Sequence, residues 1–596
     1  MSGLGKGVIT ASIAKLLQLS NYNVSCMKID PYLNVDAGTM NPLMHGEVFV
    51  TDDGGECDMD IGAYERFLDV NLSKDHNLTT GKVFSSVIEK ERRGDYLGQC
   101  VQIIPHVTDE IKYRIRELAS RYNLDILVVE CGGTVGDIES LPFLEAMRQM
   151  WLEEGNDNVL FVHVTLAPIL DVVGEVKTKP TQHSVQELRR IGIQPDIIAV
   201  RSKVMLDGDV KRKIALFTNV RVQDVISCHD VEYIYEVPEV LAKQDLVSII
   251  KEKLKLYNKE INTPLWNSWR SIVDSYRNLK GEINIAMVGK YVKLADSYVS
   301  VNHALNHAGA NLGYRVRIHH IDSEIFEHED DPYYAKVLMH HFKAVINAYN
   351  TNKSNRERLY SNSTNNLLLS NEALLSNESI EYYSSDGNPL KILDYFDGIL
   401  VPGGFGKRGS EGIIRVADYA RVKDIPYLGI CFGFQLAIVA FARYVCMLDN
   451  ANSTEIDENT NHPVVHLLPE QRGIDKMGGT MRLGLHEIDV KSDTLAYKVY
   501  NNKTKIYKRH RHRYELNTEY KDMLEKNGMI FSGWSDDARR MEILEIPKNR
   551  FYFAVQYHAE FTSRPGKPEE SFLAFVKAAI DYSKRNKSFI NYDNNI

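Results

Sequence analysis

The chain has 596 residues, of which 44% are apolar and 25% charged, and a net charge of −9 at pH 7. That length predicts two or more domains, and the modest acidic charge excludes a protein that coats nucleic acid. Seven scattered cysteines fit neither a disulfide framework nor a Cys-x-x-Cys metal site. Because no run of 18 apolar residues and no charged-then-apolar leader occurs, we expect a cytoplasmic protein with no membrane partner.

A glycine-rich loop with a lysine, Gly-Leu-Gly-Lys-Gly at residues 3–7, opens the chain and is followed by an amphipathic helical pattern. Backbone N–H groups at a helix N-terminus, together with Lys6, are suited to hold phosphate. The motif is weak by itself, because the usual Ser or Thr after the lysine is missing. A P-loop also follows a buried β-strand, and Met1 stands where that strand should have ended. We therefore expect the native protein to be longer than this chain.

The first 260 residues alternate strand-like and helical patterns. Apolar runs at 24–29, 125–129, 159–165 and 196–200 predict the strands of a parallel sheet with crossover helices. This alternation predicts an α/β fold for the first half of the chain.

Acidic and basic side chains follow the predicted strands. Asp58 and Asp60 alternate and are predicted to share one strand face, and Glu130 ends a strand at the edge where ligands collect in open parallel sheets. Asp60 and Glu130 are candidate Mg²⁺ ligands, with a solvated loop carboxylate as the simpler interpretation of either one alone. Residues 177–182, Lys-Thr-Lys-Pro-Thr-Gln, predict a second anion-binding loop.

A second α/β series follows a helical connection. We predict a first domain at 1–262, a linker at 263–282 and a second domain at 283–596. Residues 327–391 interrupt the second series with Asn/Ser-rich, low-complexity sequence, which predicts a disordered surface insertion.

Residues 427–435, Tyr-Leu-Gly-Ile-Cys-Phe-Gly-Phe-Gln, predict an apolar strand that turns sharply at Cys431 and enters a helix. Far downstream, His558 and Glu560 lie two residues apart, so that on a strand both would point to one face. A thiol at an elbow, an imidazole that takes its proton and a carboxylate that orients the imidazole form a nucleophilic triad. This half is therefore predicted to cleave an amide through a thioester.

Six long strings of sequence, in this order, resemble the CTP synthase family. They are Lys-Ile-Asp-Pro-Tyr-Leu-Asn-Val-Asp at 28–36, His-Gly-Glu-Val-Phe-Val at 45–50, Lys-Glu-Arg-Arg-Gly-Asp-Tyr-Leu-Gly at 90–98, Gly-Gly-Thr-Val-Gly-Asp-Ile-Glu-Ser at 132–140, Gly-Glu-Val-Lys-Thr-Lys-Pro-Thr-Gln-His-Ser at 174–184 and Arg-His-Arg-His-Arg-Tyr-Glu at 509–515. The resemblance implies an α/β fold, with an N-terminal P-loop-type parallel-sheet amidoligase domain and a C-terminal class I glutamine amidotransferase domain. It also implies ATP-dependent amination of UTP to CTP with ammonia from glutamine. One departure is His558-Ala559-Glu560, where the family usually has His-Pro-Glu.

The resemblance also implies the roles of individual residues. The catalytic triad is Cys431, His558 and Glu560. The oxyanion hole and glutamine site comprise Gly404, Phe432, Gly433, Phe434, Gln435, Glu455 and Arg513. The ATP site comprises Gly3, Leu4, Gly5, Lys6, Gly7, Val8, Lys28, Asp60, His229, Asp230 and Val231. The UTP site, which CTP shares, comprises Ser2, Asp137, Ile138, Glu139, Lys177, Thr178, Lys179, Pro180, Thr181, Gln182 and Lys213. The Mg²⁺ ligands are Asp60 and Glu130.

Members of the family are homotetramers that GTP activates and CTP inhibits, and they pass ammonia through an internal tunnel. The resemblance implies the same properties for this chain. It leaves open whether the protein forms filaments. Two alternatives remain at this point. Another P-loop amidoligase with a fused glutaminase, such as the cobyrinic acid amidating type, shares the triad and the phosphate loop but does not require the 177–182 string. An inactive paralogue that serves as a regulatory or assembly subunit is favoured by the shortened phosphate loop and disfavoured by the intact triad.

Overall fold

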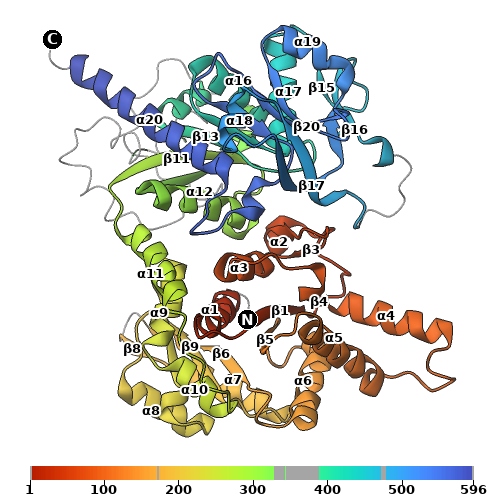
Figure 1. Ribbon diagram of the computed structural model, residues 1–596, viewed down its shortest axis with the longest axis vertical. Coiled ribbons are helices and arrows are strands. Elements are labelled where there is room, and N and C mark those ends of the chain that lie inside the picture. The colour runs from red at the N-terminus through yellow and green to blue at the C-terminus, as the bar shows by residue number, and fades with distance from the viewer. Residues whose placement is uncertain are drawn as a thin grey trace. The chain divides into compact units, whose positions relative to one another are not determined.

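The computed structural model describes residues 3–170, 174–327, 388–471 and 478–593, together with Leu338 and Lys343. The chain divides into two compact units, each built as an α/β structure (Figure 1). The first unit comprises Met1–Ala37 and Cys57–Arg277, and the second comprises Gly38–Glu56 and Asn278–Ile596. Most of the predicted linker, as far as Arg277, therefore belongs to the first unit. The short stretch Gly38–Glu56, near the start of the chain, belongs to the second unit.

Two three-stranded parallel sheets form the frame of the first unit. One has the order β4-β1-β5 and the other the order β10-β9-β6. Their strands are β1 (Val24–Asp30), β4 (Asn77–Thr79), β5 (Ile126–Cys131), β6 (Val162–Leu166), β9 (Ile197–Ser202) and β10 (Val225–His229). The four predicted strands are thus confirmed, with ends that shift by a few residues. All seven residues of β1 are buried, as expected for a parallel strand covered on both faces.

Helices cover these sheets (Figure 1). They are α1 (Lys6–Leu19), α3 (Met59–Leu68), α4 (Thr80–Arg93), α5 (Thr108–Arg121), α6 (Leu141–Glu154), α7 (Lys179–Arg190), α8 (Gly208–Thr218), α9 (Val237–Ala242), α10 (Leu246–Lys253) and α11 (Thr263–Arg277). The predicted helix after the glycine-rich loop is α1, and Gly5 caps it with a φ of 78°, a backbone conformation that glycine adopts without strain.

A nine-stranded sheet organises the second unit, in the order β12-β11-β13-β14-β22-β21-β20-β17-β18. The first five strands pair in parallel and the others antiparallel. Their bounds are β11 (Gly281–Gly289), β12 (Tyr314–Asp322), β13 (Gly398–Val401), β14 (Tyr427–Ile430), β17 (Arg482–Val490), β18 (Lys505–His512), β20 (Ile530–Ser535), β21 (Arg540–Glu545) and β22 (Tyr552–Val555). A small sheet adds β15 (Asn452–Ser453), β16 (Pro463–Leu467) and β19 (Tyr514–Leu516).

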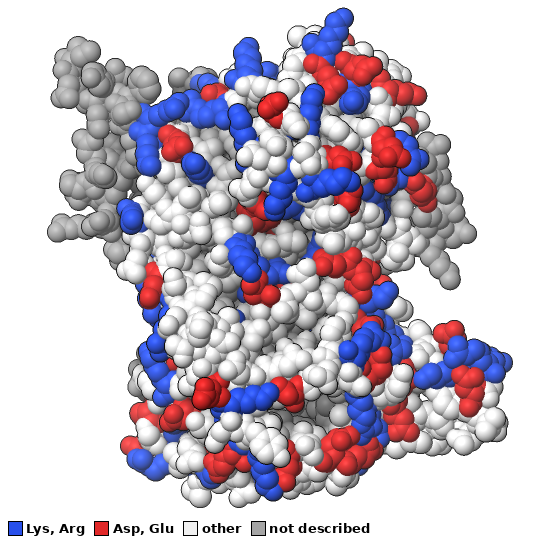
Figure 2. All heavy atoms as spheres, in the orientation of Figure 1, with Lys and Arg blue, Asp and Glu red and all other residues white. Residues whose placement is uncertain are grey.

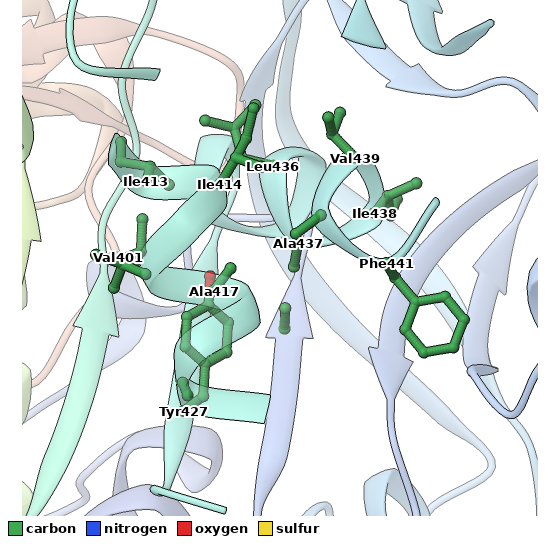
Figure 3. Packing of buried hydrophobic residues seen from close by; sticks show 14 of the residues in the cluster. Val401, Ile413, Ile414, Ala417, Tyr427, Leu436, Ala437, Ile438, Val439 and Phe441 are labelled. Atoms are coloured by element: carbon green, nitrogen blue, oxygen red, sulfur yellow. The ribbon is translucent and has the colours of Figure 1, made fainter. Parts of the chain in front are cut away.

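Two apolar cores form around this sheet. Ile399 and Val401 of β13 belong to one cluster, whereas Leu400, which lies between them, belongs to the other. Figure 3 shows side chains of α16 (Ser410–Lys423) and α17 (Phe432–Tyr444) packed around Val401 and Tyr427 in the first cluster. The second cluster contains residues of α12 (Val299–Leu312) and α20 (Glu570–Asp593). Because side chains alternate along a strand, this division buries both faces of the parallel strands.

The remaining named elements are short. They are α2 (Pro42–His45), α18 (Leu495–Val499), α19 (Lys521–Lys526), β2 (Val48–Val50), β3 (Glu56–Asp58), β7 (Ile169–Leu170) and β8 (Glu175–Val176). The predicted insertion at 327–391 lies almost entirely outside the described residues. In the described part of the chain, no helix has both the length and the hydropathy that crossing a membrane requires. On the face drawn in Figure 2, basic and acidic side chains are interspersed, in keeping with the modest net charge.

Candidate active site

Cys431 lies at a sharp turn between β14 and α17, as predicted. Its φ of 52° and ψ of −96° are a strained conformation for a residue with a side chain. Two glycines allow the close packing of this elbow. A Cβ on Gly429 would lie 2.8 Å from the carbonyl oxygen of Gly433, and a Cβ on Gly433 would lie 2.4 Å from that of Val401. The Gly-x-Cys-x-Gly spacing therefore has a steric cause.

His558 and Glu560 meet through a turn and not through a strand. β22 ends at Val555, and Glu560 lies in the 3₁₀ turn Ala559–Thr562, so the prediction that both residues lie on one strand is wrong. The turn nevertheless brings His558 Nδ1 to 2.7 Å from Glu560 Oε1. Among the described residues, the buried Nε2 of His558 has no hydrogen-bond partner. That nitrogen is therefore available to exchange a proton with the nucleophile.

The charges around His558 favour its protonated form. Burial opposes a charged imidazole, but Glu560 and Cys431 outweigh it and raise the pKa of His558 to about 10. Gly403 allows this close packing, because a Cβ there would lie 2.8 Å from His558 Cε1. The side chain of Gln556 reaches the Cys431 sulfur at 3.7 Å. The arrangement is that of a thiol nucleophile with a proton carrier that a carboxylate orients.

A cavity of about 50 Å³ lies beside Cys431. Two predicted residues are placed here: Gly404 lines the cavity, and Phe432, the first residue of α17, follows the nucleophile. Gly433 and Phe434 continue the first turn of α17 and are buried. The structure thus places the predicted oxyanion and nucleophile segments in one unit, next to one cavity.

The three predicted glutamine-holding side chains make hydrogen bonds within the protein. Gln435 Nε2 donates to the carbonyl of Tyr514 at 2.8 Å, and Glu455 accepts from the N–H of Gly406 at 2.7 Å. Burial raises the pKa of Glu455 and lowers that of Arg513. Arg513 donates to Gln471 and, at 3.1 Å, to Thr480.

Residues 38–56 also contribute to this site. The predictions from the sequence missed this contribution. Arg509 and Arg511 of β18 bind Asp52 at 2.6 Å and Glu56 at 2.9 Å. The cavity beside Cys431 is also lined by Pro42, Glu47 and Val48. The strings at 45–50 and 509–515 are both family motifs, but nothing in either indicates that they meet across more than 450 residues of chain.

In the first unit, Lys28 lies at the centre of an acidic cluster. Its Nζ contacts Asp60 and lies 3.4 Å from Asp58, 3.3 Å from Glu130 and 3.8 Å from Asp30. Asp58 and Asp60 do not share a strand face as predicted, because α3 begins between them. Asp58 caps that helix by accepting the N–H of Asp60 at 2.9 Å, and this places both carboxylates beside Lys28.

The cluster fits a divalent cation by its charge and its donor atoms. Four carboxyl groups surround one ammonium group, and burial raises the pKa of Asp30 to about 8 and also raises the pKa values of Asp58 and Glu130. Burial opposes the charge of Lys28, but the carboxylates outweigh it and raise its pKa. A divalent cation would offset the excess negative charge, and carboxylate oxygens are the ligands that Mg²⁺ prefers.

The glycine-rich loop lies against this cluster. A Cβ on Gly7 would lie 1.9 Å from Asp60 Oδ1. Burial opposes the charge of Asp60, but Lys28 and, to a smaller extent, Lys6 outweigh it and lower the pKa of Asp60. Leu4 and Lys6 line a larger cavity next to Glu130. Gly3 belongs to the same loop, and Val8 follows in the first turn of α1.

The predicted adenine-side segment, 229–231, begins at His229, the last residue of β10. Arg201 ties it to the sheet by donating to Asp230 at 2.8 Å and to the carbonyl of Cys228 at 2.6 Å. A Cβ on Gly5 would lie 3.8 Å from Arg201 Nε, so this segment and the glycine-rich loop are neighbours.

The predicted UTP residues that the structure describes lie in two loops and on two helices, α7 and α8. In the first loop, Thr134 N–H donates to Asp137 at 3.1 Å ahead of the 3₁₀ turn Ile138–Ser140, which contains Ile138 and Glu139. In the second loop, Lys177 pairs with Glu175 at 2.6 Å. Thr181, in the first turn of α7, donates its Oγ1 hydrogen to the carbonyl of Leu166 at 3.0 Å.

The second loop leads directly into α7. Pro180 lies in its first turn, and Gln182 donates to Thr178 at 3.1 Å. Lys179 lies 5.5 Å from the ring centre of Phe217 on α8, the helix that carries Lys213. Ser2, the remaining predicted residue of the UTP site, lies outside the described residues.

Comparison with known proteins gives matches along both halves of the chain. Residues 1–256 match the family model of the CTP synthase N-terminus, and residues 344–578 match that of class I glutamine amidotransferases. The CTP synthase of Pyrococcus abyssi is 51% identical over 585 residues, which cover 98% of this chain and 97% of that protein. The CTP synthase of Saccharolobus solfataricus is 50% identical over 580 residues, which cover 97% of each protein. A solved structure, the glutaminase domain of Trypanosoma brucei CTPS with bound acivicin, is 31% identical, covers 50% of this chain and 94% of its own, and has a TM-score of 0.38.

Proposed function

The chain belongs to the CTP synthase family, and we infer from this that it is a ligase that aminates UTP to CTP at the expense of ATP, with nitrogen from glutamine. The inference rests on the sequence identity of 51% with the CTP synthase of Pyrococcus abyssi, which extends over 98% of the chain. The geometry supports it independently, since one unit holds a thiol, imidazole and carboxylate at an elbow and the other holds a lysine and four carboxylates beside a glycine-rich loop.

In the second unit, Cys431 is the nucleophile that attacks the amide carbon of glutamine. His558 takes the thiol proton and later gives a proton to the departing ammonia, while Glu560 holds the imidazole through Nδ1. The N–H groups of Gly404 and Phe432 stabilise the oxyanion of the tetrahedral intermediate. Water then hydrolyses the thioester and releases glutamate. Gln435, Glu455 and Arg513, with the amides of Gly433 and Phe434, hold the glutamine.

In the first unit, the γ-phosphoryl group of ATP is transferred to the 4-oxygen of UTP. Lys6 and Lys28 offset negative charge on the phosphates, and the N–H groups at the start of α1 hold them. The phosphorylated oxygen then leaves as inorganic phosphate when ammonia adds at the same ring carbon, and CTP and ADP result. Asp60 and Glu130 would hold Mg²⁺, which when bound neutralises charge on the transferred phosphoryl group.

We propose that the loops described above select the nucleotide substrates. The 177–182 loop, with Lys213 and Ser2, would bind UTP phosphates, and residues 137–139 would contact the ring that distinguishes CTP. Residues 229–231 would lie on the adenine side of ATP. Resemblance to the family is the support for these roles, and also for a cytoplasmic homotetramer that GTP activates and CTP inhibits.

The direct test is a spectrophotometric assay of CTP formation with UTP, ATP and Mg²⁺, run in parallel with glutamine and with ammonium chloride. CTP from both nitrogen sources is the expected result. Turnover with ammonium but without UTP would favour another amidoligase, and no product from either source would favour a regulatory paralogue.

A further inference from the structure

Three side chains that commonly bind metals meet in the interior of the second unit, and none of them belongs to the sites described above. They are His510 and His512 of β18 and Glu542 of β21. All three are buried, and one nitrogen or oxygen atom of each lies within 4.8 Å of the other two. β18 and β21 are not neighbours in the nine-stranded sheet. The curvature of that sheet therefore brings together side chains that strand pairing alone would keep apart.

The backbone fixes which ring nitrogen of each histidine carries the hydrogen. Nδ1 of His510 lies 3.1 Å from the carbonyl oxygen of Lys508, and Nδ1 of His512 lies 3.0 Å from that of Tyr514. A carbonyl oxygen only accepts, so each Nδ1 is the donor, and a neutral imidazole then presents a lone pair at Nε2. Histidines that bind metals are typically held in this way, with a backbone carbonyl on the other nitrogen.

These lone pairs face other acceptors and no donor. Nε2 of His510 lies 3.0 Å from Oε2 of the Glu542 carboxylate. Nε2 of His512 is buried and has no hydrogen-bond partner among the described residues. Buried acceptors without a donor are costly, so the arrangement calls for a cation among them. A second proton on His510 would satisfy one contact and leave His512 without a partner, whereas a metal ion would satisfy all three groups.

The carboxylate of Glu542 is held by its other oxygen. Arg482 contacts Oε1 at 2.5 Å, and Ser535 donates its hydroxyl hydrogen to the same atom at 2.6 Å. Both contacts direct Oε2 towards the histidines, as hydrogen bonds around metal-binding carboxylates do. The charge of Arg482 opposes a second cation, so the ion must gain its affinity from the two imidazole nitrogens. That requirement favours Zn²⁺ and related transition metals over Mg²⁺.

We propose that His510, His512 and Glu542 form a buried structural site for one transition-metal ion of the Zn²⁺ type. The ligand atoms are the two Nε2 nitrogens and Oε2, and a water molecule completes the tetrahedron. Zinc–nitrogen bonds of about 2.05 Å place neighbouring ligand atoms of a tetrahedral site about 3.3 Å apart, which is close to the contact between His510 and Glu542.

The ion would join β18 to β21 within the sheet. Side chains alternate along a strand, so Arg509 and Arg511, which bind residues 38–56, lie on the opposite face of β18 from the two histidines. The metal would thus fix the position of the strand that holds this segment. The proposal goes beyond the proposed function, and its test measures bound metal and not turnover.

The experiment uses the full chain, expressed in medium that contains Zn²⁺ and purified without chelators, because a buried ion would enter during folding. Mass spectrometry of the metal content should give about one zinc ion per chain. A parallel preparation with Co²⁺ should show the visible bands of tetrahedral cobalt without a strong thiolate band in the near ultraviolet. A thiolate band would place the ion at a cysteine and overturn the proposal.

His512→Asn is the decisive variant, because the amide N–H of Asn can replace Nδ1–H and only Nε2 is lost. We expect the metal content to fall at least about tenfold in His512→Asn and in Glu542→Gln. His307→Asn is the matched control and should keep the metal, since His307 is equally buried in the same unit and its Nδ1 contacts Ser563.

Circular dichroism checks the folding of each variant. If Glu542→Gln fails to fold because Arg482 loses its partner, His512→Asn still decides the question. A wild-type chain with less than about a tenth of an equivalent of metal would overturn the proposal, as would equal metal contents in the wild type and His512→Asn.

Discussion

At the scale of single residues, we expect the pair His558–Glu560 to set the pH dependence of glutamine hydrolysis. The pKa of His558 is raised to about 10, so its protonated form is present at neutral pH and is lost as the pH rises through that value. Glu560→Gln removes the charge that holds the proton, and we expect the alkaline limb of the pH–rate profile to move to lower pH. The rate should also fall by about 10²- to 10⁴-fold, because the imidazole loses its orienting carboxylate. The pH profile of glutaminase activity checks this, and an unchanged limb would contradict the role of Glu560.

Gly433 allows a second test at this scale, since a Cβ there would meet the Val401 carbonyl oxygen at 2.4 Å. Gly433→Ala is expected to cost about 1–3 kcal/mol of unfolding free energy and to displace Cys431, with loss of glutamine hydrolysis. Gly478→Ala is the matched control, because its Cβ would make only an ordinary 3.5 Å contact with Thr39. Denaturant unfolding of both variants gives the comparison, and equal stability would show that the elbow relaxes easily.

At the scale of elements, residues 38–56 are held to β18 by buried arginines. Arg509 has no exposed side-chain surface and binds Asp52 at 2.6 Å. Asp52→Asn is expected to lower the unfolding free energy of the second unit by about 2 kcal/mol, because a buried guanidinium loses its charged partner. The neighbouring Asp53 is exposed, so Asp53→Asn should change little. Urea unfolding monitored by intrinsic fluorescence would reveal the difference, and two identical curves would argue against this contact as an anchor.

At the scale of the whole molecule, the two units should lose their activities separately. Cys431→Ala is expected to abolish glutamine-dependent CTP formation, by roughly 10⁴-fold or more, and to leave ammonia-dependent formation largely intact. The reason is that the proposed role of the thiol is confined to the release of ammonia from glutamine. Parallel assays with glutamine and ammonium chloride measure both rates. Near-normal use of glutamine by the variant would refute the nucleophile assignment.

The converse is expected in the first unit. Asp60→Asn or Glu130→Gln removes a carboxylate beside Lys28 that is proposed to bind Mg²⁺, so both glutamine- and ammonia-dependent synthesis should fall sharply. Glutamine hydrolysis should continue, because Cys431 belongs to the other unit. Isothermal titration of Mg²⁺ in the presence of ATP provides a readout besides turnover. Normal ammonia-dependent synthesis in either variant would exclude that residue as a ligand.

The sequence by itself determined the features that depend on local pattern. Apolar runs of strand length predicted β1, β5, β6 and β9, and the glycines around Cys431 predicted a strand–turn–helix. Such features are local because burial of one segment and the sterics of one turn depend on neighbouring residues. The long motifs likewise identified the family, since a motif can be recognised without knowledge of any contact.

Only the tertiary structure decided which distant segments meet. It showed that 38–56 belongs with the second unit, that a helix cap and three strands bring four carboxylates to Lys28, and that a 3₁₀ turn brings His558 to Glu560. It also brought His510 and His512 to Glu542 from strands that are not neighbours in the sheet. Most of these contacts join residues that are far apart in the chain. The contact between His558 and Glu560 depends on a turn, which the alternation of side chains along a strand does not predict. Their geometry follows from the packing of whole elements and not from the periodicity of any one segment.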